Sequence, residues 1–112
     1  MDLKLTFKGF DGHVTMNVAK NIERLEMLDQ IGINVMDLAG NKKAAENAFK
    51  KPEVVIKLLK ASIKHYKEVN LTRGHKTYKT FDELDEDMDC QKVQMDCATA
   101  SLLGIGGNTG KK

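Results

Sequence analysis

The sequence has few of the residues that build an aromatic core, and it has no segment suited to a membrane. Aromatic residues make up 5% of the 112 residues and tryptophan is absent, so we expect an aliphatic core. No apolar run approaches the ~20 residues that a membrane-spanning helix needs. The N-terminus, with Asp2 and alternating lysines, does not resemble a signal peptide. We therefore expect a cytosolic protein without membrane partners.

Only two cysteines are present, Cys90 and Cys97, and both fall in one predicted helix. Seven helical residues rise about 10.5 Å, whereas a disulfide requires Cα atoms within about 7 Å. We therefore expect reduced thiols. With His65 and His75 these cysteines are the soft-metal candidates, but zinc sites have paired ligands at short spacing and this chain does not. We expect no metal and no cofactor.

Common catalytic motifs are also missing. The chain contains no G-x-S-x-G, no H-E-x-x-H and no G-x-x-x-x-G-K-[ST] sequence. We expect no helix after the glycines from Gly104 onward, and therefore no nucleotide-binding loop there. We therefore expect no catalytic residue and a protein that is not an enzyme.

Charged residues are numerous and are unevenly distributed along the sequence. The net charge is +2, but residues 1–80 hold 15 Lys and Arg against 9 Asp and Glu, whereas residues 81–112 hold 3 against 7. The pI of about 8.5 lies below the value of about 9 that is typical of nucleic-acid-binding domains. The basic stretch 64–79 and the carboxylates of 82–89 instead favour contacts within the fold or between copies.

The N-terminal residues predict a β-hairpin. Apolar residues alternate with polar ones over residues 2–8, which is the pattern of a strand with one buried face. Asp11 and Gly12 predict the tight turn, and residues 14–16 continue the return strand.

Helical spacing begins after this hairpin. We expect Asn17 to cap a helix that ends at Gly32, where a left-handed residue closes it. Asn41 is expected to begin a short helix through Phe49. A third helix begins at Pro52, and its apolar face is expected in the core, partly shared with another copy: Leu58, Leu59, Ile63 and Tyr66.

The C-terminal third predicts a loop, an acidic helix and a tail. Residues 69–79 lack helical periodicity and are expected to be a loop. Thr80 and Glu83 form a capping-box pattern that begins a helix extending to residue 103. Its apolar line is expected to pack in the core: Leu84, Met88, Met95 and Leu102. The remaining residues, 104–112, are expected to be a flexible glycine-rich tail.

Taken together, these elements predict one domain over residues 1–103. The expected fold class is mainly α (α+β), with a short N-terminal β-hairpin followed by about four helices. A small helical module of this kind is typical of proteins that bind other proteins, because flexible methionines and aliphatic helix faces accept varied partners.

The arrangement resembles the tail assembly chaperones of long-tailed bacteriophages and prophages. Five segments carry the resemblance, and they span nearly the whole chain: LKLTFKGFDGHVTM, IERLEMLDQIGI, PEVVIKLLKASIKHYKE, TFDELDEDMD and ATASLLGIGG. The resemblance implies a mostly helical fold with a small β element. It also implies a non-catalytic protein that coats the tape measure protein, recruits tail tube subunits and self-associates into a homo-oligomer. Such a protein works in the cytoplasm of the bacterial host and is absent from the mature virion.

Candidate partner-binding residues come from the basic stretch and the acidic segment: Tyr66, Arg73, Lys76, Lys79, Asp82, Asp85, Glu86, Asp87 and Met88. Two other functions remain open at this point. A small nucleic-acid-binding regulator would use the basic stretch on phosphates, and a structural head–tail joining subunit would stay in the finished particle.

Overall fold

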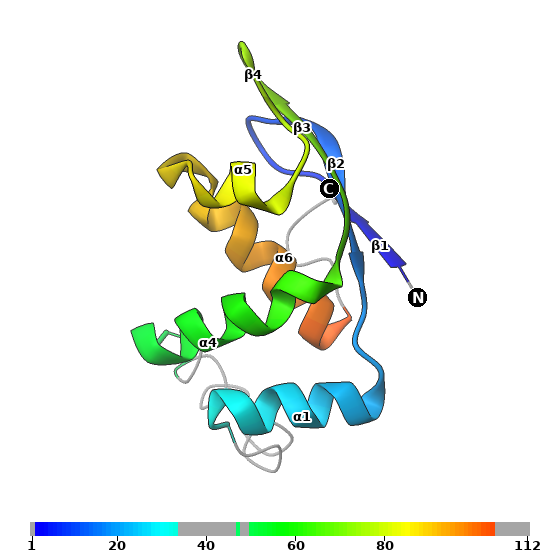
Figure 1. The fold of residues 1–112 in the computed structure, drawn as a ribbon, viewed down its shortest axis with the longest axis vertical. Helices are drawn as coiled ribbons and strands as arrows, with labels where there is room; N and C mark the ends of the chain where they lie inside the picture. The colour runs from blue at the N-terminus through cyan, green and yellow to red at the C-terminus, as the bar shows by residue number, and fades with distance from the viewer. Residues whose placement is uncertain (1, 34–46, 48–49, 105–112) are drawn as a thin grey trace.

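The computed structural model describes residues 2–33, 47 and 50–104. Within these residues the chain forms one four-stranded antiparallel sheet, with strand order β1-β2-β3-β4, and four α-helices (Figure 1). The elements follow one another as β1 (Asp2–Leu5), β2 (Asp11–Asn17), α1 (Asn21–Ile31), α4 (Pro52–Ser62), β3 (Tyr66–Arg73), β4 (Lys76–Tyr78), α5 (Phe81–Asp85) and α6 (Gln91–Leu103). Two 3₁₀ turns, η1 (Ile63–His65) and η2 (Met88–Cys90), join α4 to β3 and α5 to α6.

The expected fold class is therefore wrong. The prediction had a short N-terminal hairpin followed only by helices, whereas two strands of the sheet come after α4. Helices and strands are interleaved along the sequence, and β3 pairs with β2 across more than 50 residues of chain. Long-range pairing of this kind leaves no local spacing signal.

The N-terminal hairpin is confirmed, but its turn lies elsewhere. Leu5 faces Val14 in the antiparallel register, as the alternation predicts. The turn is formed at residues 7–10, where the amide of Phe10 donates to the carbonyl of Phe7 over 3.1 Å. Asp11 and Gly12, expected to form the turn, instead begin β2 and pair with β3.

Residues 69–79 are not a loop, because they form most of a second hairpin. Gly12 pairs with Leu71, which in turn faces Tyr78 on β4. Gly74 makes the connection with a positive φ of 61°, a conformation that glycine adopts without steric cost. Val69 and Leu71 point to the same buried side, since alternate residues of a strand share a face.

Helix α1 begins later than expected. Asn17 is the last residue of β2, so it does not cap the helix, and the N-cap position belongs to Lys20. The predicted end is confirmed, because Gly32 has a left-handed φ of 89° and its amide donates to the last-turn carbonyls.

The helix that begins at Pro52 is confirmed at its start and is shorter than expected at its end. It ends at Ser62, and after η1 the chain becomes β3 at Tyr66. Leu58 is fully buried, whereas Ile63 is 45% exposed because it lies beyond the helical register that sets the buried face.

The acidic helix expected over residues 80–103 is two helices. The chain leaves helical geometry at Asp87, which has φ −115° and ψ 117°, and resumes with η2 and α6. Leu84 and Leu102 are fully buried as predicted, but Met88 is 81% exposed, so its expected place in the core is wrong.

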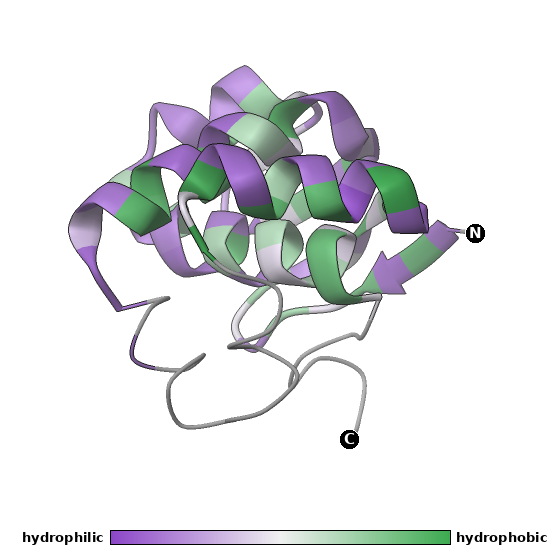
Figure 2. Ribbon diagram, turned by 90° about the horizontal axis from the view of Figure 1, so that it is seen from below, coloured by the Kyte–Doolittle hydropathy of each residue, from purple (hydrophilic) through white to green (hydrophobic). Residues whose placement is uncertain are grey.

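The buried side chains form two clusters that share α6. In the first, residues of the sheet pack on α5 and on Val93, Cys97 and Ala100 of α6. In the second, residues of α1 and α4 pack on Ala98 and Leu102. Figure 1 shows α6 between the sheet and the pair α1 and α4, and Figure 2 shows apolar and hydrophilic residues alternating along the helices.

Some predicted features fall outside the described residues. They are the short helix over residues 41–49, apart from Asn47, and the glycine-rich tail beyond Gly104. Gly104 itself is described and ends α6 with a left-handed φ of 76°.

Candidate protein-binding surface

The predicted capping box is formed at the start of α5. The hydroxyl of Thr80 accepts from the amide of Glu83 at 3.2 Å, and the Glu83 carboxylate accepts from the amide of Thr80 at 3.0 Å. Glu83 also accepts from the amide of Lys79 at 2.6 Å. These bonds fix the direction in which the acidic segment leaves the sheet.

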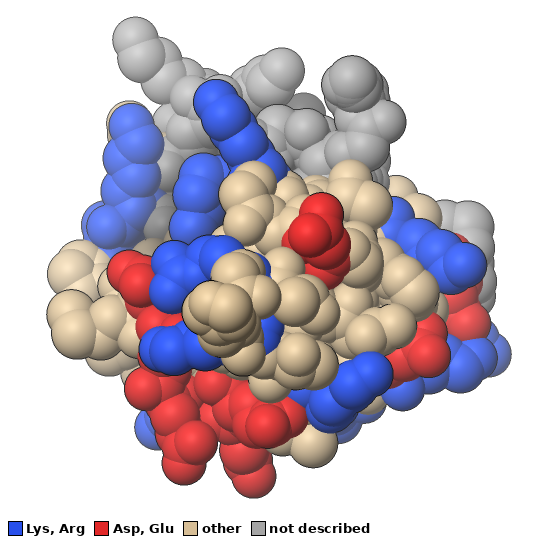
Figure 3. All heavy atoms as spheres, turned by 90° about the horizontal axis from the view of Figure 1, so that it is seen from above, with Lys and Arg blue, Asp and Glu red and all other residues tan. Residues whose placement is uncertain are grey.

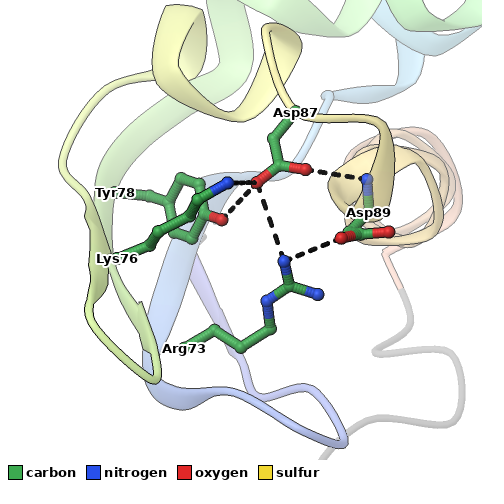
Figure 4. Close-up of polar contacts among 5 residues, drawn as sticks. All are labelled: Arg73, Lys76, Tyr78, Asp87 and Asp89. Atoms are coloured by element: carbon green, nitrogen blue, oxygen red, sulfur yellow. Dashed lines mark hydrogen bonds and ion pairs between the residues drawn. The ribbon is translucent and has the colours of Figure 1, made fainter.

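Asp87 is the centre of a polar cluster that ties this segment to the β3–β4 hairpin (Figure 4). One oxygen of its carboxylate accepts from the hydroxyl of Tyr78 and lies 3.3 Å from the ammonium of Lys76 and 3.8 Å from the guanidinium of Arg73. The other oxygen accepts from the amide of Asp89 at 2.9 Å. Arg73 also donates to the Asp89 carboxylate at 2.8 Å.

This cluster shifts the pKa values of its members. The pKa of Asp87 is lowered to about 2, first by the hydrogen bond from Tyr78 and then by the Asp89 amide and Lys76. The same hydrogen bond raises the pKa of Tyr78 to about 12, since ionisation would remove the donated proton. The Asp87 carboxylate is therefore ionised at neutral pH, and its contacts hold β4 against η2.

Some of the predicted site residues belong to this cluster and others lie outside it. Arg73, Lys76 and Asp87 come together as predicted candidates, but they contact one another within one chain. Lys79 lies apart, with its ammonium 3.1 Å from the side-chain oxygen of Asn70. Tyr66 is partly buried and packs edge-on against the ring of Phe81 at 4.8 Å.

The remaining candidates lie on or beside α5. Asp85 accepts from the side-chain amide of Gln94 at 2.8 Å. Asp82, Glu86 and Met88 are exposed, and neither carboxylate makes an ion pair with another described residue. Figure 3, which looks onto the hairpin end of the molecule, shows acidic side chains gathered along one side with Lys and Arg beside them.

A cleft of about 490 Å³ lies between the edge strand β4 and the segment from α5 to η2. We name it the β4–α5 groove, and its lining residues are Lys76, Thr77, Tyr78, Glu83, Glu86, Asp87 and Met88. Three carboxylates, one ammonium group and the exposed side chain of Met88 line it. Such a groove suits a polypeptide that offers both apolar and basic side chains.

Sequence reasoning missed Thr77 and Tyr78 as groove residues, because the segment was interpreted as a loop. The alternation of Val69 and Leu71 with polar neighbours, followed by Gly74, is the signal that indicates a hairpin here.

The cysteines are buried and in the thiol form. Both Cys90 and Cys97 are free and fully buried. Burial raises the pKa of Cys97 to about 12 and also raises that of Cys90, which opposes formation of the reactive thiolate. Over residues 2–33, 47 and 50–104, no three His, Cys, Asp or Glu side chains are placed to hold a metal ion.

In the same part of the chain, no helix combines the length and the apolar character that crossing a membrane requires. Comparisons of the sequence with protein-family models and with curated proteins, and of the fold with solved structures, found no match.

Proposed function

We propose that this protein is a tail assembly chaperone of a long-tailed bacteriophage or prophage. In this proposal it binds the tape measure protein and recruits tail tube subunits in the host cytoplasm, without catalysing a reaction. The observation that carries the proposal is Met88, an apolar side chain that is 81% exposed beside the β4–α5 groove. Methionine is flexible and polarisable, so it adapts to the varied apolar faces of a long helical client.

The charged residues that remain unpaired support self-association. Arg73 and Lys76 are paired with Asp87 and Asp89 inside the chain, so they are less available to a second copy. Helix α4 and η1 expose a stripe of lysines and isoleucines: Ile56, Lys57, Lys60, Ile63 and Lys64. None of these lysines makes an ion pair with another described residue. We propose that this stripe meets the carboxylates of α5 in another copy.

The client-binding part of the proposal is tested by charge insertion at the groove. Met88→Glu places a further carboxylate beside the groove, and Ile22→Glu places one on α1, where Ile22 is 74% exposed. Both positions are solvent-exposed, so both variants should fold. In a pull-down with the tape measure protein encoded by the same phage, we expect Met88→Glu to lose the client and Ile22→Glu to retain it. Equal recovery of the client by both variants would contradict the proposal.

Two further measurements separate this function from the alternatives. Mass spectrometry of purified virions should not detect the protein, whereas its presence there would favour a head–tail joining subunit. A mobility-shift assay with DNA at low salt should give no complex, whereas a complex that weakens steeply with salt would favour a nucleic-acid-binding regulator.

A further inference from the structure

All three residues of the edge strand β4 line the β4–α5 groove: Lys76, Thr77 and Tyr78. Successive side chains of a strand point to opposite faces of the sheet, so side chains alone do not bring three neighbours to one groove. What the three residues share is the backbone edge that faces away from β3. The groove therefore runs along an end of the sheet, because the order of the described strands places β4 last.

The β3–β4 hairpin fixes the direction of the backbone groups at this edge. Arg73 and Lys76 face each other across a two-residue turn, and in the next pair Thr72 faces Thr77. The pair that flanks such a turn is the hydrogen-bonded one, and hydrogen-bonded pairs alternate with non-hydrogen-bonded pairs. The N–H and C=O of Thr77 therefore point away from β3.

Lys79 gives an independent observation of this direction. It lies two residues after Thr77, so in an extended chain its amide points the same way. Its ammonium reaches Asn70 of β3 at 3.1 Å, which shows that the chain still follows the hairpin there. Its amide donates to the carboxylate of Glu83, a groove residue, at 2.6 Å. Outside the sheet, the backbone of Thr77 makes no hydrogen bond with another described residue.

The wall opposite β4 carries unpaired negative charge. Of the three carboxylates that line the groove, only that of Asp87 is paired with a cation, Lys76, among the described residues. Glu83 and Glu86 are exposed and make no ion pair with another described residue. Met88, which is 81% exposed, adds an apolar contact beside them. This wall is complementary to a segment with both basic and apolar side chains.

We infer that the groove binds an extended segment of the client, which adds to the sheet as a strand beside β4 and carries a lysine or arginine. Its backbone pairs with the N–H and C=O of Thr77, and its basic side chain faces Glu83 and Glu86. Strand addition suits an open sheet edge, because main-chain hydrogen bonds give affinity and the side chains give selectivity. A helical segment would leave the Thr77 groups unpaired, since the backbone of a helix is bonded internally. The inference rests on the proposed function, because it specifies which kind of client segment the groove holds.

Two substitutions of Thr77 separate backbone pairing from side-chain contact. Thr77→Pro removes the outward N–H, and an edge strand tolerates proline at a position whose N–H faces away from the sheet. Thr77→Val keeps the N–H and the shape of the side chain. In binding titrations with the tape measure protein encoded by the same phage, we expect a Kd about tenfold weaker for Thr77→Pro and an unchanged Kd for Thr77→Val. Circular dichroism checks that both variants are folded.

A second pair of variants tests the basic residue of the client. Glu86→Lys reverses an exposed charge in the groove, and Glu26→Lys reverses an exposed charge on α1, at the other end of the molecule (Figure 1). We expect the Kd for the tape measure protein to weaken about tenfold in Glu86→Lys and to stay unchanged in Glu26→Lys. Equal weakening in both variants would mean general charge repulsion and would overturn the assignment of a basic segment.

Hydrogen–deuterium exchange of the full chain, alone and in complex with the tape measure protein, decides the backbone pairing even if Thr77→Pro does not fold. We expect the Thr77 amide to exchange rapidly in the chain alone and to be protected in the complex. The amide of Ile22 lies in the first turn of α1, where amides lack an acceptor within the helix, and should stay unprotected in both.

The outcomes separate this inference from the proposed function. If Met88→Glu loses the client but the Thr77 amide stays unprotected in the complex, or a folded Thr77→Pro binds like Thr77→Val, the inference is overturned and the proposed function stands. If the unsubstituted chain does not bind the tape measure protein, both are overturned. Protection of the Thr77 amide that rises with the concentration of the chain alone would assign the edge to a second copy, and would also overturn the inference.

Discussion

Replacing Gly12 by alanine tests the pairing of β2 with β3, on which the position of β4 and of the groove depends. Gly12 has a φ of +96°, and a Cβ added there would lie 2.0 Å from the carbonyl oxygen of Asn70 on β3. Gly9, in the preceding turn, has a similar φ of +88° but no atom within 4 Å of an added Cβ. The two glycines therefore share the backbone conformation and differ in the close approach of a second strand.

This difference sets the expected magnitudes. Gly9→Ala should lower the free energy of unfolding by about 1–2 kcal/mol, the strain of an L-residue in left-handed geometry. Gly12→Ala carries the same strain and adds about 1–3 kcal/mol, because the strands must separate to accept the methyl group. The expected loss of about 2–5 kcal/mol is a large part of the 5–15 kcal/mol that is typical of a folded domain.

Urea denaturation followed by circular dichroism measures both variants. We expect a lower midpoint for Gly12→Ala than for Gly9→Ala, with similar m-values. Equal losses in the two variants would mean that Asn70 does not lie against Gly12, and they would contradict the pairing of β2 with β3 at this position.

Three further predictions concern charge, thiols and the junction of α1 with α6. The pKa of Asp87 is lowered to about 2, so its carboxylate stabilises the fold fully above its ordinary pKa of 3.8 and progressively less as the pH falls towards 2. In urea denaturation between pH 5 and 2, the free energy of unfolding of Asp87→Asn should therefore fall less steeply with decreasing pH than that of the unsubstituted protein. Cys90 and Cys97 are fully buried, so a thiol reagent should modify them only in denaturant; rapid modification of the native protein would contradict their burial. Arg24→Met should lower the free energy of unfolding by about 1.5–3 kcal/mol, because Arg24 donates to the Leu102 carbonyl at 2.6 Å, and thermal or urea denaturation measures this loss.

The sequence predicted those helix ends that depend on one residue and its near neighbours. Pro52 begins α4, Gly32 ends α1 and Thr80 caps α5, as predicted from residue type alone. Each of these positions depends on one backbone conformation or one side-chain hydrogen bond within four residues.

The second hairpin has a weaker local signal, the alternation around Val69 and Leu71 before Gly74, and its pairing with β2 depends on residues far away in the chain. Helical spacing after Pro52 runs on to Tyr66 in the sequence, yet Tyr66 begins β3. What makes this segment a strand is its pairing with β2, including the contact of His13 with Glu68 at 2.9 Å. The local alternation of a strand does not identify a pairing partner 55 residues away.

The sequence did not predict how the candidate residues are arranged. The acidic segment and the basic stretch were expected to make contacts within the fold or between copies, and the structure shows contacts within the chain, where Asp87 interrupts the helix and binds Tyr78 and Lys76. The same interruption leaves Met88 in the 3₁₀ turn and exposed, whereas a continuous helix would have turned it towards the core.

Photo-cross-linking from position 88 is the most direct measurement of the central claim, that the groove beside Met88 binds another polypeptide. A photoreactive amino acid is incorporated at position 88 and, as a control, at position 22, and adducts formed during phage production are identified by mass spectrometry. We expect an adduct with the tape measure protein from position 88 and none from position 22. No polypeptide adduct at position 88, or the same adducts from both positions, would mean that the groove does not bind the client.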